Sequence, residues 1–441
     1  MIPKLTASTI YSTLGNNSSL VPLAMKDIAN SCGLTAASYM AGDKVEGKDR
    51  FIDEFGTQAI WLWGIPAYKK ILDVAMFKPL GFDPKVDARI LKNPEILAAA
   101  RELAPTEAVK NSLKSAAEHA SKFKALTVAK FAASTVLTTL TYLGLTKFRH
   151  KYTEDQIKKD YFEKQKGKNV SFMDKSNNVP FSSAFSPVYN NIGNKGVTFT
   201  GGVQDFIFDP VKNLMLVDAS ITGERLSHSR NPQDFFGYVI KEGSFWAFMY
   251  LAGPLISKAL EKSADKKGRS IDLDARVLES CEFKDAFANG SVKSHLNSFK
   301  AADKSDVEIY KFAVNSVNSA KAEGKNLITE MAAKSDIIGL LKDSDKVDTR
   351  KYIDLGELRG VSEKIEKLLN QYEKSGQTID EFFKSVRKLK RSAVLKNMGA
   401  CVGALGVLAP AIMLLMRKFS PEYQVKADVE KKLAESLVTK K

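Results

Sequence analysis

Apolar residues along this chain fall either into long uninterrupted runs or at spacings of three and four. The second pattern is clear in ILAAARELAPTEAVKNSLKSAAEHASKFKAL and SEKIEKLLNQYEKSGQTIDEFFKSVRKLKR, which also consist largely of good helix formers. Such spacing predicts amphipathic α-helices. The one β signal lies at 206–217, where two short apolar runs flank DPVKN and predict a hairpin. The expected fold class is therefore mainly α, with a short β-hairpin.

The longest apolar run, residues 397–416, contains 20 consecutive uncharged residues. An α-helix of about 20 residues crosses roughly 30 Å of hydrocarbon, so this segment is predicted to span a membrane. Its Gly399 and Gly403 form a GxxxG pattern, which is predicted to let another helix pack closely. Residues 125–146, with Lys130 as their one charge, are a second and weaker candidate span.

Two shorter apolar segments, residues 55–68 and 243–257, are rich in Trp and Tyr and contain a proline. They are too short for a simple span unless their helices continue past Lys69 and Lys258. Since Trp and Tyr favour the headgroup zone, we interpret both as interfacial or re-entrant segments. A buried, kinked core helix is the alternative.

These segments belong to a pattern that occurs twice. Glu54 and Pro66 recur as Glu242 and Pro254 at an offset of 188, and VDARIL recurs as LDARVL at an offset of 187. A Lys-Phe pair follows each long apolar run, at an offset of 271, so the second copy carries about 84 extra residues. The sequence thus predicts two diverged copies of one helical, membrane-associated module.

The repeat predicts a domain organisation. The first module covers residues 1–165 and the second covers 203–441, with a helical insertion within 280–390. Residues 166–202 are dense in Asn, Ser, Gly and Pro and are predicted to be a flexible linker.

The chain is basic, with 66 Lys and Arg against 51 Asp and Glu and a formal net charge of +15. Because Lys is spread along the chain and mixed with acidic residues, most charges are predicted to lie on solvated helix faces, and no specific nucleic-acid partner is expected. One cluster before the second span is predicted to contact anionic lipid. It comprises Lys384, Arg387, Lys388, Lys390 and Arg391.

The same basic residues leave the membrane topology open. Lys or Arg flanks both ends of each candidate span, contrary to a simple crossing. Either apolar hairpins enter from the cytoplasmic side, with most soluble mass on that side, or the apolar segments are the core of a soluble bundle. The expected location is a membrane, with most of the soluble mass on the cytoplasmic side.

Residues that carry chemistry are few. The three cysteines are widely separated, and HExxH, CxxC, phosphate-loop and nucleophile-elbow motifs are absent from the sequence, so no catalytic, metal or cofactor site is predicted. Acidic and basic residues present in both copies are instead predicted to form structural pairs, Glu54 with Arg89 and Glu242 with Arg276. Residues 225–230 are interpreted as a polar loop.

These patterns lead to an expected function of membrane anchor, scaffold or lipid-interacting protein without enzymatic activity. Its partners would be membrane lipids, mainly anionic, together with a protein partner or a second copy of the chain. A transport or channel component acting as an oligomer is the first alternative, because duplicated modules with helices broken at Gly or Pro build the central site of many carriers. A soluble, basic helical binding protein is the second.

Overall fold

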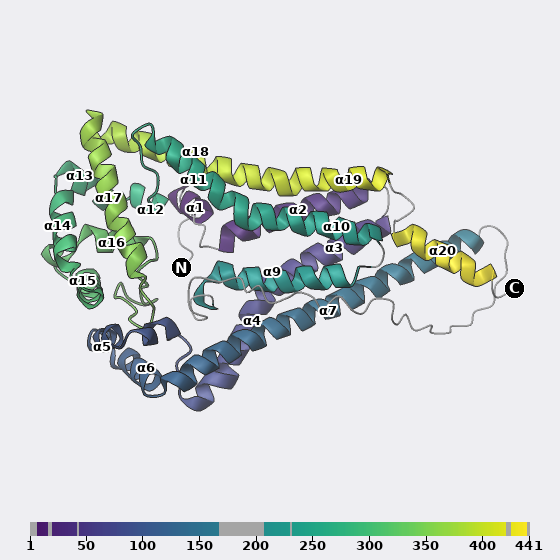
Figure 1. Cartoon of the computed structure of the whole chain (residues 1–441), viewed down its shortest axis with the longest axis horizontal. Coiled ribbons are helices and arrows are strands. Elements are labelled where there is room, and N and C mark those ends of the chain that lie inside the picture. Colours follow the sequence, from purple (N-terminus) through teal and green to yellow (C-terminus); the bar gives the residue numbers. More distant parts are fainter. Residues whose placement is uncertain are drawn as a thin grey trace, which may run out of the picture.

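The computed structural model describes residues 7–15, 20–41, 44–166, 207–229, 232–419 and 425–438. In these ranges the chain is helical and contains no β-strand; Leu340 and Val347 form a single isolated bridge. The mainly α fold class is confirmed. The helices form an elongated bundle with a broader region, here called the head, at one end (Figure 1).

The bundle consists of nine α-helices in the described part of the chain. They are α2 Leu20–Met40, α3 Lys44–Ala59, α4 Ile65–Leu72, α7 Ala120–Lys166, α9 Pro210–Ser227, α10 Pro232–Trp246, α11 Ala252–Asp265, α18 Ile379–Gly403 and α19 Ala409–Phe419. In Figure 1, α2, α7, α9 and α18–α19 run away from the head, whereas α3–α4 and α10–α11 run back toward it. Helix α1, Ala7–Gly15, contacts α2, α12 and α18, and α20, Val425–Val438, packs on α7.

The head is built mainly from short helices. These are α5 Pro94–Glu102, α6 Glu107–Glu118, α12 Ala275–Leu278, α13 Cys281–Ala288, α14 Val292–Ala302, α15 Asp306–Asn318, α16 Leu327–Lys334 and α17 Leu355–Ser375, with 3-10 turns η3 Lys78–Leu80, η4 Ala88–Lys92 and η6 Ala322–Gly324. One apolar core joins residues 77–123 to residues 264–386. The predicted insertion therefore packs together with a segment of the first predicted module.

Four π-helical turns interrupt the longer helices: η1 Ile60–Gly64, η2 Asp73–Phe77, η5 Ala247–Leu251 and η7 Ala404–Leu408. Each lies two or three residues before a proline, namely Pro66, Pro79, Pro254 and Pro410. Proline lacks a backbone N–H and its ring clashes with the carbonyl group four residues earlier, so a wider turn relieves the clash without ending the helix. As a result, helix continues past Lys69 and Lys258, and the two shorter apolar segments are parts of longer helical passages.

The predicted hairpin is wrong for the described residues 207–217. Asp209 is the N-cap of α9: its side chain accepts hydrogen bonds from the amides of Val211 (2.9 Å) and Lys212 (3.1 Å), and Pro210 occupies the first turn. Asp-Pro is as good a helix start as a turn, and here it starts a helix. Phe206 and the predicted linker, except Lys166 at the end of α7, lie outside the described residues.

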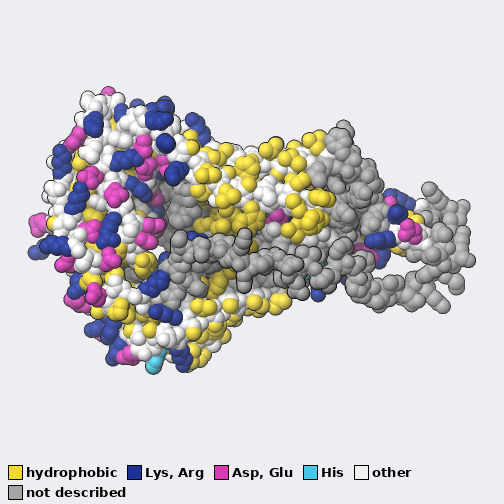
Figure 2. All heavy atoms as spheres, viewed as in Figure 1, with side chains coloured by type: hydrophobic (Ala, Val, Ile, Leu, Met, Phe, Trp, Pro, Cys, Tyr) yellow, Lys and Arg dark blue, Asp and Glu magenta, His cyan; other side chains and the backbone are white. Residues whose placement is uncertain are grey.

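The bundle surface differs from the head surface. On the face drawn in Figure 2, apolar side chains cover much of the bundle, whereas Lys, Arg, Asp and Glu gather on the head. Two helical passages, Ala120–Lys164 and Ile379–Leu415, are long and apolar enough to cross a membrane. The first contains the candidate span 125–146, and the second contains residues 397–415 of the candidate span 397–416.

Candidate functional site in the helical bundle

Helix α2 buries several polar side chains and exposes several apolar ones. Lys26, Asp27 and Asn30 are buried, whereas Met25 and Ile28 are more than two-fifths exposed. A helix on the surface of a water-soluble protein shows the opposite arrangement. The polar stripe of α2 therefore belongs to the interior of the bundle.

The same inversion occurs in α3 and α10. Asp53 and Glu54 of α3 are at most 3% exposed, while Phe51 is 49% exposed. On α10, Lys241 is 1% exposed, while Phe236 is 55% exposed. The inward-facing polar stripes meet inside the bundle.

Together they form what we call the buried charge cluster, which contains eight acidic and four basic side chains among the described residues. Its members are Asp27, Glu46, Asp49, Arg50, Asp53, Glu54, Arg149, Asp218, Glu224, Arg225, Lys241 and Glu242. They come from α2, α3, α7, α9 and α10, so the cluster connects segments from both predicted modules.

Asp53 has cationic neighbours from four helices. Its carboxylate lies 3.2 Å from Arg149, 3.3 Å from Arg225, 3.7 Å from Arg50 and 3.8 Å from Lys241. The residue that was expected in a polar loop, Arg225, is thus a buried residue of helix α9.

Arg225 joins the two acidic sides of the cluster. Its Nη1 donates to Glu242 at 2.6 Å, its Nη2 donates to the Thr57 hydroxyl at 3.0 Å, and its Nε donates to the Tyr142 hydroxyl. Lys241 completes the arrangement, 2.8 Å from Glu54 and 3.4 Å from Glu242. Since each buried charge costs several kcal/mol of desolvation unless it is paired, these contacts hold the helices in one relative arrangement.

Lys26 is buried beside the π-turn η5. Its Nζ lies 3.5 Å from the carbonyl oxygen of Met249, and a Cβ added to Gly253 would come within 2.8 Å of the same Nζ. A glycine at position 253 therefore makes room for the ammonium group, which interacts with a carbonyl group of the widened turn.

A small cavity of about 20 Å³ lies within the cluster. Its lining includes Asp27, Asn30, Trp61, Asp218 and Lys241. Asn30 is 1% exposed, and neither its Nδ2 nor its Oδ1 has a hydrogen-bond partner. We expect the buried amide of Asn30 to form hydrogen bonds with a bound polar molecule, because an unsatisfied buried polar group costs about 1–3 kcal/mol.

The structure does not bring the predicted pairs together. Glu54 lies beside Lys241 and Glu242 beside Arg225, whereas Arg89 pairs with Asp87 at 2.7 Å. Arg276 likewise pairs with Asp274 (3.1 Å) and with Asp336 (2.8 Å). The Asp of each Asp-Ala-Arg motif is a helix N-cap outside the helix, so it can bond the Arg two residues later.

The N-cap role affects the acidity of Asp274. Burial alone would raise the pKa of this carboxyl, but hydrogen bonds from Arg276 and from the Ser12 hydroxyl (2.6 Å) lower the pKa below its ordinary value. The motif thus ties α1 to the head, and its arginine is structural.

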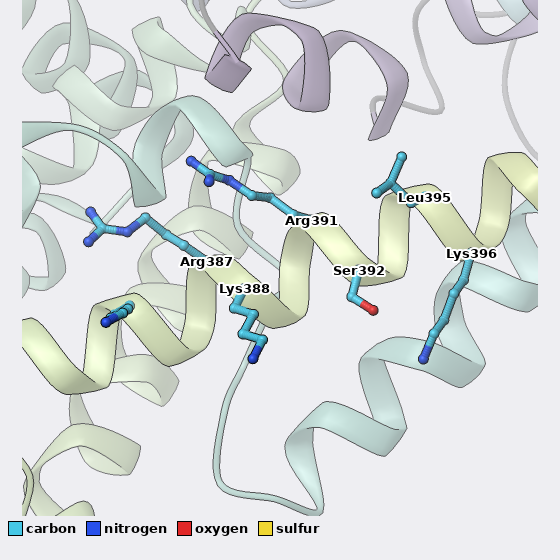
Figure 3. A pocket seen from close by; sticks show the side chains of 7 residues that line it. Arg387, Lys388, Arg391, Ser392, Leu395 and Lys396 are labelled. Atoms are coloured by element: carbon cyan, nitrogen blue, oxygen red, sulfur yellow. The ribbon is translucent and has the colours of Figure 1, made fainter.

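The predicted lipid-contacting residues lie on α18, between the head and the apolar part of that helix. Figure 3 shows Arg387 and Arg391 pointing to one side of the helix, and Lys388 to the other. With Lys384 they line an open hollow of about 760 Å³. Lys390 does not line it: its Nζ donates to the carbonyl of Ile271 at 2.7 Å.

Glycine does mediate close helix packing, but not through the predicted pair. An added Cβ would meet no atom within 4 Å at Gly399 or Gly403. At Gly33 on α2 it would lie 2.2 Å from the carbonyl oxygen of Gly406 in η7, and at Gly406 it would lie 3.1 Å from the carbonyl oxygen of Ala29. Helix α2 and η7 therefore pack backbone to backbone.

The sequence contained a signal for the cluster that the sequence analysis did not use. On α3, Glu46, Asp49 and Asp53 follow helical spacing, a pattern that also fits an amphipathic helix in water. The spacing does not tell which face points inward. Within the described chain no group of three or more His, Cys, Asp or Glu side chains could hold a metal ion.

Comparison with known proteins found no match: no protein-family model, no curated protein and no solved structure is similar to this chain.

Proposed function

We propose that this chain is a membrane-spanning transport protein that moves a small cation through the interior of its helical bundle, with the head on one side of the membrane. The observation that carries the proposal is the burial of charged side chains on α2, α3 and α10, such as Asp27, Asp53 and Lys241, on helices that also expose large apolar side chains. Ionisable residues inside membrane helices are expensive and commonly mark a path for ions or protons.

The alternative of a passive anchor explains the apolar surface but not the buried charges. Anchoring requires apolar side chains alone, whereas the cluster adds a desolvation cost for every charge. The excess of acidic over basic members favours a cation as the transported species. A soluble bundle would place the polar stripes outside instead.

Duplication of a three-passage module is part of this proposal, supported by matching contacts in the two halves. Asp27 bonds Trp61 of η1, and Asp218 bonds Tyr250 of η5. The Ser31 hydroxyl accepts from Gln58 at 2.7 Å, and that of Thr222 accepts from Trp246 at 3.1 Å. The positions in each matching pair are separated by 188 to 191 residues, close to the offset in the sequence.

Two experiments test the proposal. In sealed vesicles of one orientation, a membrane-impermeant maleimide should reach either Cys281, exposed in the head, or a cysteine replacing Lys159 at the far end of α7, but not both. In liposomes, the purified chain should support a flux of H⁺, Na⁺ or K⁺. Labelling of both sites from the same side, or the absence of any cation flux, would contradict it.

Contact with anionic lipid is a second candidate role, favoured by the basic hollow on α18 (Figure 3). Its position beside the apolar helix would put Lys384, Arg387 and Lys388 at headgroup level. Replacing these three by Gln should reduce binding to vesicles that contain phosphatidylserine, whereas replacing exposed Lys304 and Lys321 of the head should not.

A further inference from the structure

Two carboxyl groups of the buried charge cluster differ from the rest in their surroundings. Asp27 accepts a hydrogen bond from Trp61 Nε1 at 2.9 Å, and Asp218 shares a hydrogen bond with the Tyr250 hydroxyl. Both partners are neutral. In the described part of the chain neither carboxyl has an ion pair, whereas Asp53, Glu54 and Glu242 each have at least one.

A buried carboxylate without a counter-charge is strongly unfavourable, and such a group takes up a proton instead. The charged groups that face the two carboxyls across the cavity are Glu54, Arg225, Lys241 and Glu242. These four pair with one another, so they leave Asp27 and Asp218 without a cation of their own.

The cavity connects the two carboxyls. Asp27, Asn30 and Asp218 all line it, and its volume of about 20 Å³ suffices for one water molecule. Asn30 offers a free amide donor and a free carbonyl acceptor at this place. A water molecule bonded to Asn30 would therefore share one cavity with both carboxyls, as a proton relay requires.

We propose that Asp27 and Asp218 are the proton-binding groups of this protein, and that protons pass between them through the cavity beside Asn30. This inference rests on the proposed transport function and names its cargo. Once one Asp has lost its proton, the carboxylic acid at the other gives its proton to the water, which gives another to that carboxylate. One proton moves, and no oxidant or reductant takes part.

The surroundings favour a proton over a metal cation. Trp61 and Tyr250 direct N–H and O–H groups at the carboxyls, and such donors suit a proton-carrying carboxyl or a water molecule better than a metal cation, which needs oxygen lone pairs as ligands. Each donor lies in a π-turn, Trp61 in η1 and Tyr250 in η5, which gives the two carboxyls similar environments.

Infrared spectroscopy of the purified full chain tests proton binding without any transport. We expect a carbonyl stretch of protonated carboxylic acid at neutral pH that shifts in D₂O and weakens in both Asp27→Asn and Asp218→Asn. The band should persist in Asp345→Asn, a matched change at an exposed position of the head. A spectrum without this band, or with a band insensitive to both cavity variants, would overturn the proposal.

Proton flux in liposomes, driven by a potassium gradient with valinomycin, tests the relay itself. We expect at least a tenfold loss of flux in Asp27→Asn and Asp218→Asn and none in Asp345→Asn. Proton flux unchanged in the cavity variants, or sodium flux that they abolish without any proton flux, would overturn the proposal. If the wild type carries no ion, the transport function fails, while the infrared result still decides whether the two carboxyls bind protons.

Discussion

Replacement of Gly33 by Ala tests the backbone contact between α2 and η7. The new Cβ would lie 2.2 Å from the carbonyl oxygen of Gly406 and 2.8 Å from Pro410 Cγ, and neither neighbour is the end of a flexible side chain. The two helices must move apart. Overpacking of this kind costs up to about 3 kcal/mol. Better helix propensity returns about 1 kcal/mol, so we expect a net loss of roughly 2 kcal/mol.

Gly403→Ala is the matched control, because it makes the same change on a helix that packs against α2 but in open space. Only the gain in helix propensity remains, so this variant should be more stable than wild type by about 1 kcal/mol. Thermal unfolding of both variants in the same detergent, followed by circular dichroism, measures the difference. A Gly33→Ala protein that melts at or above the wild-type temperature would refute the close packing.

Two further predictions concern buried charge. Arg225→Leu should destabilise the bundle by about 3–5 kcal/mol, because it leaves Glu242 without its guanidinium partner, and Arg225→Leu with Glu242→Leu should recover part of this loss in thermal unfolding. In the head, burial alone would raise the pKa of Asp83, but the Lys85 amide and the Arg350 guanidinium at 2.9 Å lower it below its ordinary value. The contribution of Asp83 to stability is thus full above the unfolded pKa of about 4 and lost as the pH falls through the folded pKa. The melting temperature of Asp83→Asn should therefore fall less between pH 5 and pH 2 than that of the wild type, and an equal fall would contradict this.

Local patterns in the sequence predicted the helices and the apolar runs well. Helical spacing and the 20-residue run at 397–416 depend on neighbours in the chain, and both are present in the structure as helix. The prediction of a hairpin was wrong for a local reason as well. Asp209-Pro210 is compatible with either a turn or a helix start, and in the structure it starts helix α9.

The charge cluster was beyond such reasoning, because it depends on which face of each helix is covered. Arg225 and Asp53 are 172 residues apart and meet only when α9 packs beside α3. Glu54 and Glu242 were singled out from the sequence, but their partners, Lys241 and Arg225, follow from the packing of helices that are far apart in the chain.

Trp63 gives the most direct test of the claim that the bundle surface faces lipid. Its side chain is 71% exposed on η1, whereas Trp61 two residues earlier is 6% exposed. In liposomes with brominated acyl chains, tryptophan fluorescence of the wild type should be strongly quenched, and Trp63→Phe should lose most of the quenched component. Iodide in the water should have little effect on that component. Efficient quenching of Trp63 by iodide, with none by the brominated lipid, would contradict a membrane-embedded bundle.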